Sequence, residues 1–242
     1  MKVMTVCHKC TSAPGAAVMM SGDLDNDLLA ICTCPNGHRF MVHQAHSAPE
    51  VIYSAGVRAF AAGFYSESVV TLSAALERAY ELFTKVFLLA SGKAIADIAT
   101  YWKDLESSSE RQLGAFCSAY FCATGMPWRT SPDKASFRNK VAHKGYIATR
   151  EQAHEYGEYV TAGFNVIISY LKTHYNDAFL LYLESCRAVV YRKLEELARR
   201  DPSIEFGFAG TTAIEWNGTG YEQPTFDSRV AASSSMINQL NC

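Results

Sequence analysis

The sequence predicts a mainly α-helical protein with a small β module at its N-terminus and a short β-hairpin-like extension at its C-terminus. Apolar residues recur at helical spacing from residue 49 to residue 200. The preceding segment lacks that spacing and is rich in Cys, Gly, Pro, Asn and Asp, while an Asn-Gly pair between short mixed runs follows Pro202. We therefore divide the chain into residues 1–47, 48–201 and 202–242.

The central region is expected to fold as a bundle of helices joined by short loops. The expected helices cover about residues 49–63, 66–91, 93–105, 111–123, 132–144, 150–174 and 177–200. Three pairs of residues have the pattern of N-terminal caps, namely Ser107 with Glu110, Ser131 with Pro132, and Thr149 with Gln152. Because caps satisfy the free amide groups of a first helical turn, these pairs predict where helices begin.

The C-terminal region is expected to differ from the helical one. The hairpin pattern lies within residues 212–223, "TAIEWNGTGYEQ", with Asn217 and Gly218 at its turn. The polar sequence beyond Phe226 is expected to be partly flexible.

Composition restricts the class of protein. With 242 residues and 49% hydrophobic residues, the chain can form one large domain or two smaller ones. Its net charge of −2 excludes a broad basic surface, so any contact with nucleic acid must be local. There is no uninterrupted run of 18 apolar residues and no signal-peptide pattern, so we expect a cytoplasmic protein without a membrane partner.

The eight cysteines fall into two groups. Four lie within the first 34 residues at short spacings, and in a reducing compartment such clusters favour a metal over disulfides. Cys117, Cys122 and Cys186 stand in apolar segments and are expected to be small buried residues.

The first cysteine group predicts a structural zinc site. Cys7 and Cys10 form a Cys-x2-Cys knuckle, and "CTCPNGH" supplies Cys32, Cys34 and His38 about twenty residues later. Five candidates compete for four tetrahedral positions, and the favoured set is Cys7, Cys10, Cys34 and His38. In the alternative, Cys32 replaces Cys34 or His38. The arrangement resembles a zinc ribbon, a small β module that often recognises nucleic acid or protein.

A second candidate site lies in the stretch "FRNKVAHKG", which contains Arg138, Asn139 and His143. On a helix Asn139 and His143 share a face, whereas Arg138 and His143 are offset by about 140°. Lys140 and Lys144 add positive charge at the C-terminal end of the same helix, where cations are favourable. From spacing alone, this stretch is either a solvated basic turn or a site for phosphate and proton transfer.

The context of this stretch resembles the HEPN superfamily, whose all-α domains carry an Arg, often a polar residue after it, and a His four to six residues on. An aliphatic-Ala pair precedes His143, a glycine follows, and a capped helix comes next. The resemblance covers about residues 49–200. Glu77 stands where the family often has an acidic residue that supports the site, and Glu67 and Glu81 are nearby competitors.

The resemblance implies a metal-independent endoribonuclease that forms a homodimer, with two Arg–His motifs facing one composite cleft. His143 would exchange protons, Arg138 would hold the scissile phosphate, and Asn139 would orient the His or contact substrate. Lys140 and Lys144 would strengthen binding of single-stranded RNA. No catalytic metal is expected.

Members of this superfamily often act as toxins or phage-defence effectors, so an antitoxin or another regulatory protein is an expected partner. Two other hypotheses keep the fold without the chemistry. The domain would then bind RNA or a nucleotide without cleaving it, or act as a zinc-dependent protein-interaction module.

Overall fold

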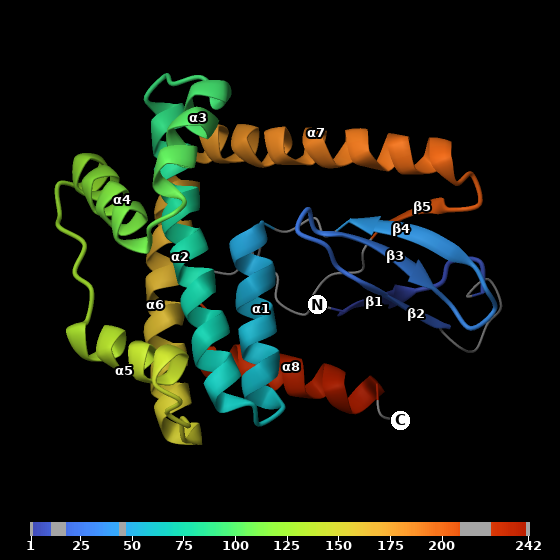
Figure 1. Cartoon of the computed structure of the whole chain (residues 1–242), viewed down its shortest axis with the longest axis horizontal. Helices are drawn as coiled ribbons and strands as arrows, with labels where there is room; N and C mark the ends of the chain where they lie inside the picture. The colour runs from blue at the N-terminus through green and yellow to red at the C-terminus, as the bar shows by residue number, and fades with distance from the viewer. Residues whose placement is uncertain (1, 11–17, 44–46, 209–223, 241–242) are drawn as a thin grey trace. The chain divides into compact units, whose positions relative to one another are not determined.

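A computed structural model describes residues 2–10, 18–43, 47–208 and 224–240 (Figure 1). It is mainly helical with a small N-terminal antiparallel sheet, which confirms the predicted fold class. The chain divides into two compact units. The sheet unit combines Met1–Ser47 with Leu183–Thr212, and the helical unit combines Ala48–Tyr182 with Ala213–Cys242.

The sheet unit contains five strands in the order β1-β2-β3-β4-β5. They are β1 (Lys2–Val6), β2 (Met19–Asp23), β3 (Leu29–Thr33), β4 (Arg39–His43) and β5 (Glu205–Phe208). The first four form antiparallel pairs, and β5 is parallel to β4. Because side chains alternate along a strand, the sheet buries Cys32, Phe40 and Val42 in one core and Leu29 and Met41 in another.

The second core of the sheet unit explains why residues 183–201 do not belong with the helical region, where the sequence analysis placed them. They form most of α7 (Asn176–Arg200), whose Val190 and Leu194 pack with Leu29 and Met41 of the sheet. Strand β5 follows this helix and was not predicted. The predicted hairpin at 212–223 lies outside the described residues.

The helical unit is built around one long central helix, α2. Its helices are α1 (Ala48–Ala61), α2 (Tyr65–Ala90), α3 (Ile95–Leu105), α4 (Ser109–Thr124), α5 (Pro132–His143), α6 (Arg150–His174), the first residues of α7, and α8 (Phe226–Leu240). Helix α2 contacts α1, α3, α4, α5 and α6, and it runs beside α1 and α6 (Figure 1). It therefore carries the core of the unit, and its buried side includes Leu72, Ala79, Phe83 and Val86.

Two of the three predicted caps are confirmed. Thr149 and Gln152 form a complete capping box at the start of α6, and the Ser131 hydroxyl accepts a hydrogen bond from the Lys134 amide at 3.4 Å. The third prediction was wrong by one residue. Ser108, and not Ser107, caps α4, because its extended backbone places its hydroxyl 3.4 Å from the Arg111 amide.

The C-terminal segment from Phe226 forms helix α8 over the described residues, which the sequence analysis did not predict. The Thr225 hydroxyl begins the helix by accepting a hydrogen bond from the Ser228 amide at 3.1 Å. The Phe226 side chain is only 2% exposed. Its ring lies against Gly157 of α6, where any added Cβ would come within 2.4 Å of the ring.

The cysteines outside the N-terminal group are less buried than expected. Cys117 is half-buried, whereas Cys122 and Cys186 are exposed, so the expectation of burial was wrong for these two. Within the described part of the chain, no helix combines the length and apolar character that crossing a membrane requires.

Candidate functional site

A first candidate site is formed by two turns of the sheet unit that bring four possible metal ligands together. After β1, the amide of Cys10 bonds to the carbonyl of Cys7 at 3.2 Å. After β3, the amide of Gly37 bonds to the carbonyl of Cys34 at 2.9 Å, and Gly37 has a φ of +81° that favours glycine. Each turn places both of its cysteine or histidine side chains on the same side.

The ligand atoms of this group have the separation of a tetrahedral site. His38 Nδ1 lies 3.2 Å from Cys10 Sγ and 3.6 Å from the Sγ atoms of Cys7 and Cys34. Zinc bonds of about 2.3 Å to sulfur and about 2.0 Å to nitrogen place tetrahedral ligands about 3.5–3.8 Å apart. Cys7, Cys10, Cys34 and His38 can therefore hold a metal ion, and they are the favoured set from the sequence.

The surroundings of Cys34 favour its thiolate. Burial raises the pKa of the Cys34 thiol, but hydrogen bonds from the His38 and Asn36 backbones and contacts with Cys7 and Cys10 outweigh it and lower the pKa to about 7. Asn36 also donates a side-chain hydrogen bond to Cys10 Sγ at 3.2 Å. That bond lowers the pKa of Cys10, but burial and the neighbouring Cys7 and Cys34 thiols raise it overall. Since metals bind the thiolate, Cys34 is the sulfur whose surroundings prepare it for an ion.

Cys32 lies outside this group. It belongs to β3 opposite Phe40, and its fully buried side chain packs in the core of the sheet unit. Burial raises the pKa of its thiol to about 11, which disfavours the thiolate. The structure thus gives Cys32 the environment of a small apolar residue.

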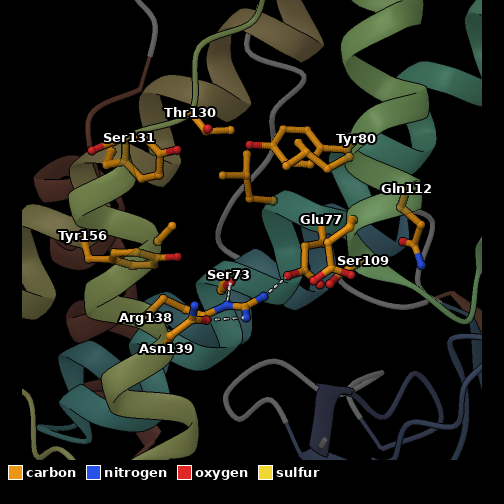
Figure 2. A pocket seen from close by; sticks show the side chains of 15 residues that line it. Ser73, Glu77, Tyr80, Ser109, Gln112, Thr130, Ser131, Arg138, Asn139 and Tyr156 are labelled. Carbon is orange, nitrogen blue, oxygen red and sulfur yellow. Dashed lines mark hydrogen bonds and ion pairs between the residues drawn. The ribbon is translucent and has the colours of Figure 1, made fainter.

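A second candidate site surrounds Arg138 in the helical unit. Helix α5 buries only Val141 among its residues, so most of its side chains face outward. Arg138 is half-buried and points from α5 towards α2 (Figure 2). Its Nε donates to the Ser73 hydroxyl at 2.9 Å, its guanidinium forms an ion pair with Glu77, and Nη1 donates to Asn139 Oδ1 at 3.0 Å.

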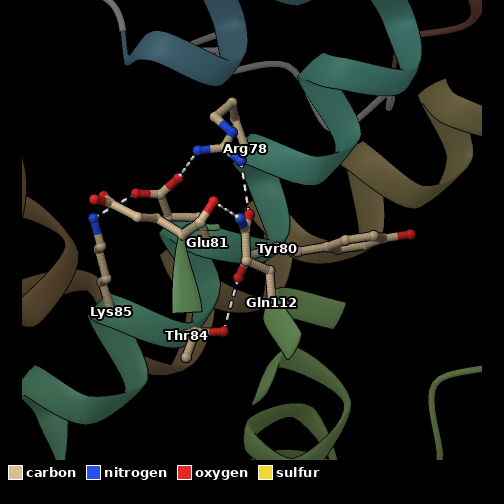
Figure 3. A network of polar contacts seen from close by, with 7 residues as sticks. Arg78, Tyr80, Glu81, Thr84, Lys85 and Gln112 are labelled. Carbon is tan, nitrogen blue, oxygen red and sulfur yellow. Dashed lines mark hydrogen bonds and ion pairs between the residues drawn. The ribbon is translucent and has the colours of Figure 1, made fainter. Parts of the chain in front are cut away.

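Glu77 is the one of the three acidic candidates on α2 that contacts Arg138. Glu81 instead pairs with Arg78 and Lys85 (Figure 3). Glu67 is exposed in the first turn of α2. The helix therefore presents Glu77 to α5 one turn away from a separate charged network.

The structure does not bring His143 against Arg138. His143, Lys140 and Lys144 are exposed around the C-terminal end of α5, and their side chains make no hydrogen bond or ion pair with other residues of the described segments. The helical offset between positions 138 and 143 explains this, because it turns the two side chains to different sides. Within one chain, Arg138 is therefore held by its neighbours, whereas the His143 side chain is exposed to solvent.

A cavity of about 250 Å³ adjoins Arg138 and was not foreseen from the sequence. It lies between α2, α4, α5 and α6, and its polar lining includes Ser73, Glu77, Glu110, Asn139 and Tyr156. Figure 2 shows the Tyr156 hydroxyl directed into it and the Arg138 guanidinium along one side. Burial raises the pKa of Tyr156 to about 12, so this phenol stays neutral near pH 7.

A hydrogen-bond network keeps the α4 wall of this cavity in place. Arg78 donates to Gln112 Oε1 at 2.7 Å, and Gln112 Nε2 donates to the Glu106 carbonyl at 3.0 Å (Figure 3). Gln112 is buried, so both ends of its amide are satisfied where water cannot replace them. Helix α4 is thereby fixed to α2 at the point where both helices line the cavity.

A further His–carboxylate group connects α6 with α8. His154 Nε2 lies 2.7 Å from Asp227 Oδ1, and His154 Nδ1 lies 3.8 Å from Glu158 Oε2. The imidazole also packs edge-on against the Phe226 ring. These contacts give His154 a role in docking α8.

Comparisons with protein-family models, with curated proteins and with solved structures found no match to this chain. The residues around the four possible metal ligands and around Arg138 therefore carry the evidence for function.

The contact between Arg138 and Glu77 predicts a measurable coupling. In a double-mutant cycle of Glu77→Ala and Arg138→Ala, followed by urea unfolding, we expect a coupling free energy of about 1 kcal/mol. The value is modest because 26% and 31% of the two side chains are exposed and solvent screens the pair. As a control, Glu81→Ala combined with Arg138→Ala should be additive, and coupling of equal size there would contradict the assignment.

Proposed function

We propose that this protein is a metal-independent endoribonuclease of the HEPN type that cleaves single-stranded RNA with Arg138 and His143. The observation that carries the proposal is the contrast along α5. Arg138 is fixed by Ser73 and Glu77, while His143 is exposed and available to a substrate. A fixed cation and an accessible proton carrier on one short helix are the two groups that RNA cleavage requires.

The chemistry follows from these groups. His143 takes the proton of a ribose 2′-hydroxyl, and the 2′-oxygen then attacks the adjacent phosphorus. The bond from phosphorus to the 5′-oxygen breaks, and the leaving oxygen receives a proton from a second His143. The products are a 2′,3′-cyclic phosphate and a free 5′-hydroxyl. Arg138 stabilises the negative charge that builds on the phosphate oxygens.

A second His143 comes from a second copy of the chain, so the proposal includes a homodimer. The end of α5 supports this arrangement because it exposes apolar as well as basic groups. Ile147, just beyond the helix, is 82% exposed, and Tyr146 is 40% exposed. Burial of such side chains favours association, and it would place two copies of His143 around one phosphate.

Local charge supports RNA as the substrate. Lys140 and Lys144 flank His143 and are exposed without ion-pair partners among the described residues. The chain as a whole carries a net charge of −2. The proposed contact with RNA is therefore confined to the end of α5, where the lysines increase the local positive potential.

The four-residue group of the sheet unit is proposed to hold a structural zinc ion. Zinc would crosslink the turns after β1 and β3, and this chain's residues would supply three thiolates and one imidazole. The proposed role in the cell is that of a cytoplasmic toxin or phage-defence effector. A zinc ribbon that recruits RNA or a partner, and an antitoxin or another regulatory protein, complete that proposal.

Analysis of RNA products tests the proposed activity. Purified dimer should cut single-stranded RNA during a short incubation with EDTA, and the fragments should carry 2′,3′-cyclic phosphate and 5′-hydroxyl ends. The zinc content is measured before and after, so that loss of the structural ion is detected. RNA binding without cleavage by zinc-loaded dimer would instead favour a non-catalytic binding module.

A further inference from the structure

We propose that the cavity beside Arg138 is a base-recognition pocket that accepts a guanine of the RNA substrate, with Glu110 reading its Watson–Crick edge. This inference rests on the proposed ribonuclease function, because it names the base next to the phosphate that is cut. It concerns residues of α2, α4 and α6 that the Arg–His stretch does not contain.

The size and walls of the cavity suit one base. Its volume of about 250 Å³ is below the range of about 300–1,000 Å³ that is typical of sites for whole small molecules. Tyr80 and Tyr156 supply aromatic surface, while Leu76 and Leu113 add apolar contacts. Proteins that recognise single-stranded RNA commonly stack an unpaired base on such rings and read its edge with polar groups.

The position of the cavity beside Arg138 favours RNA over an unrelated ligand. Arg138 and Asn139 line the cavity from α5, and the exposed end of α5 with His143 lies one turn further along the same helix. A phosphate held by Arg138 would thus leave the neighbouring base close to the mouth of the cavity. The Tyr156 hydroxyl and Ser73 complete a polar floor beneath it (Figure 2).

The polar groups select guanine among the four bases. An ionised carboxylate only accepts hydrogen bonds, so it matches an edge with two adjacent donors. Guanine offers this pattern at N1–H and N2–H₂. Adenine and cytosine place an acceptor beside their amino group, and uracil places acceptors on both sides of its single N–H. A carboxylate facing those three edges would meet at least one acceptor and be repelled.

Glu110 is the carboxylate placed for this contact. It lies in the first turn of α4 at the exposed side of the cavity, and Ser108 donates a hydrogen bond to its Oε2 at 3.1 Å. Hydrogen bonds from its own amide, Ser108 and Ser109 lower the pKa of Glu110, so it is ionised near pH 7. Since a carboxylate has about four acceptor positions, these bonds leave room for a base. Glu77 also lines the cavity but is engaged by Arg138.

Nucleotide binding tests the inference without requiring cleavage. We would titrate the full-length protein with the 3′-monophosphates of guanosine, adenosine, cytidine and uridine in a calorimeter. The guanosine compound should bind at least about tenfold more tightly than the other three, and Glu110→Gln should remove this preference. The matched control is Glu151→Gln, because Glu151 occupies the same first-turn position behind the Thr149 cap of α6 but does not line the cavity.

Cleavage mapping then separates this inference from the proposed function. The wild-type protein should cut next to guanosine, and Glu110→Gln should cut without that preference. Equal affinity for the four nucleotides, no binding of any, or a preference that survives Glu110→Gln would overturn the inference. A protein that prefers the guanosine nucleotide but never cuts RNA would retain the pocket and overturn the ribonuclease. Thermal melting of both variants confirms that they are folded.

Discussion

Replacing Cys34 with alanine is expected to abolish zinc binding and to unfold the sheet unit. The effect is large because a structural zinc contributes an apparent free energy of about 10–16 kcal/mol in small zinc domains. The strands of the sheet are short, and Cys34 belongs to the ligand group that joins the turn after β1 to the turn after β3. Metal content per chain and far-ultraviolet circular dichroism, with limited proteolysis of the first 47 residues, would measure the loss.

Cys32→Ala is the matched control for that experiment. The sulfur of Cys32 is buried in the sheet core, two residues from Cys34, and lies outside the group of ligand atoms. The variant should retain one zinc per chain and lose only the stability that a small core cavity removes. Loss of zinc from Cys32→Ala, with retention by Cys34→Ala, would contradict the ligand assignment.

Replacing His143 with alanine is expected to lower the rate of RNA cleavage by about 10²–10⁴-fold, the range typical of a lost general acid or base. Arg138→Ala should lower it by about 10²–10³-fold, because a fixed charge next to the phosphate is removed. His143 is exposed, so its replacement should leave the melting temperature unchanged, whereas Arg138→Ala also releases Glu77 and Ser73. Initial rates on a labelled RNA would measure both effects.

Arg129→Ala and His174→Ala are the controls for these two variants. Both residues are exposed in the helical unit, and neither lines the cavity. They remove the same kinds of charge and side chain from elsewhere on the surface. Losses of the same size in these controls would show that general charge, and not the site on α5, determines the rate.

The helices that the sequence predicted well are those with local signals. The capping box at Thr149 and the Ser131–Pro132 pair mark the starts of α6 and α5, and both are decided by residues within one turn. The neighbouring serines at 107 and 108 could not be separated in this way. Ser108 is the cap because its backbone is extended and its hydroxyl accepts from the Arg111 amide.

Elements held by distant contacts could not be predicted. Helix α8 is fixed by Phe226 against Gly157, about 70 positions earlier in the chain. The second half of α7 reads as part of the helical bundle, because nothing near Val190 indicates that its partner is the N-terminal sheet. Both outcomes depend on tertiary packing.

The candidate sites likewise combine features that the sequence predicts with features that depend on tertiary packing. Spacing narrowed the metal ligands to five, and strand alternation in β3 then buried Cys32. Ser73 and Tyr156 belong to no motif, and the sequence pattern assigned Glu110 only to a helix cap. Their place in a cavity could be found only once α2, α4 and α6 were placed around Arg138. The sequence offered Glu77, with Glu67 and Glu81 as competitors, as the acidic residue that supports the site. Helix packing places Glu77 against Arg138.

The most direct test of the central claim is the rate of RNA cleavage by zinc-loaded wild-type protein, Arg138→Ala and His143→Ala, measured side by side with EDTA present. Oligomeric state and zinc content are checked for each preparation. The proposal predicts cleavage by the wild type and a loss of at least about 10²-fold in each variant. Wild-type dimer that binds the RNA but leaves it intact, or variants that cut as fast as wild type, would contradict the claim that Arg138 and His143 form a ribonuclease site.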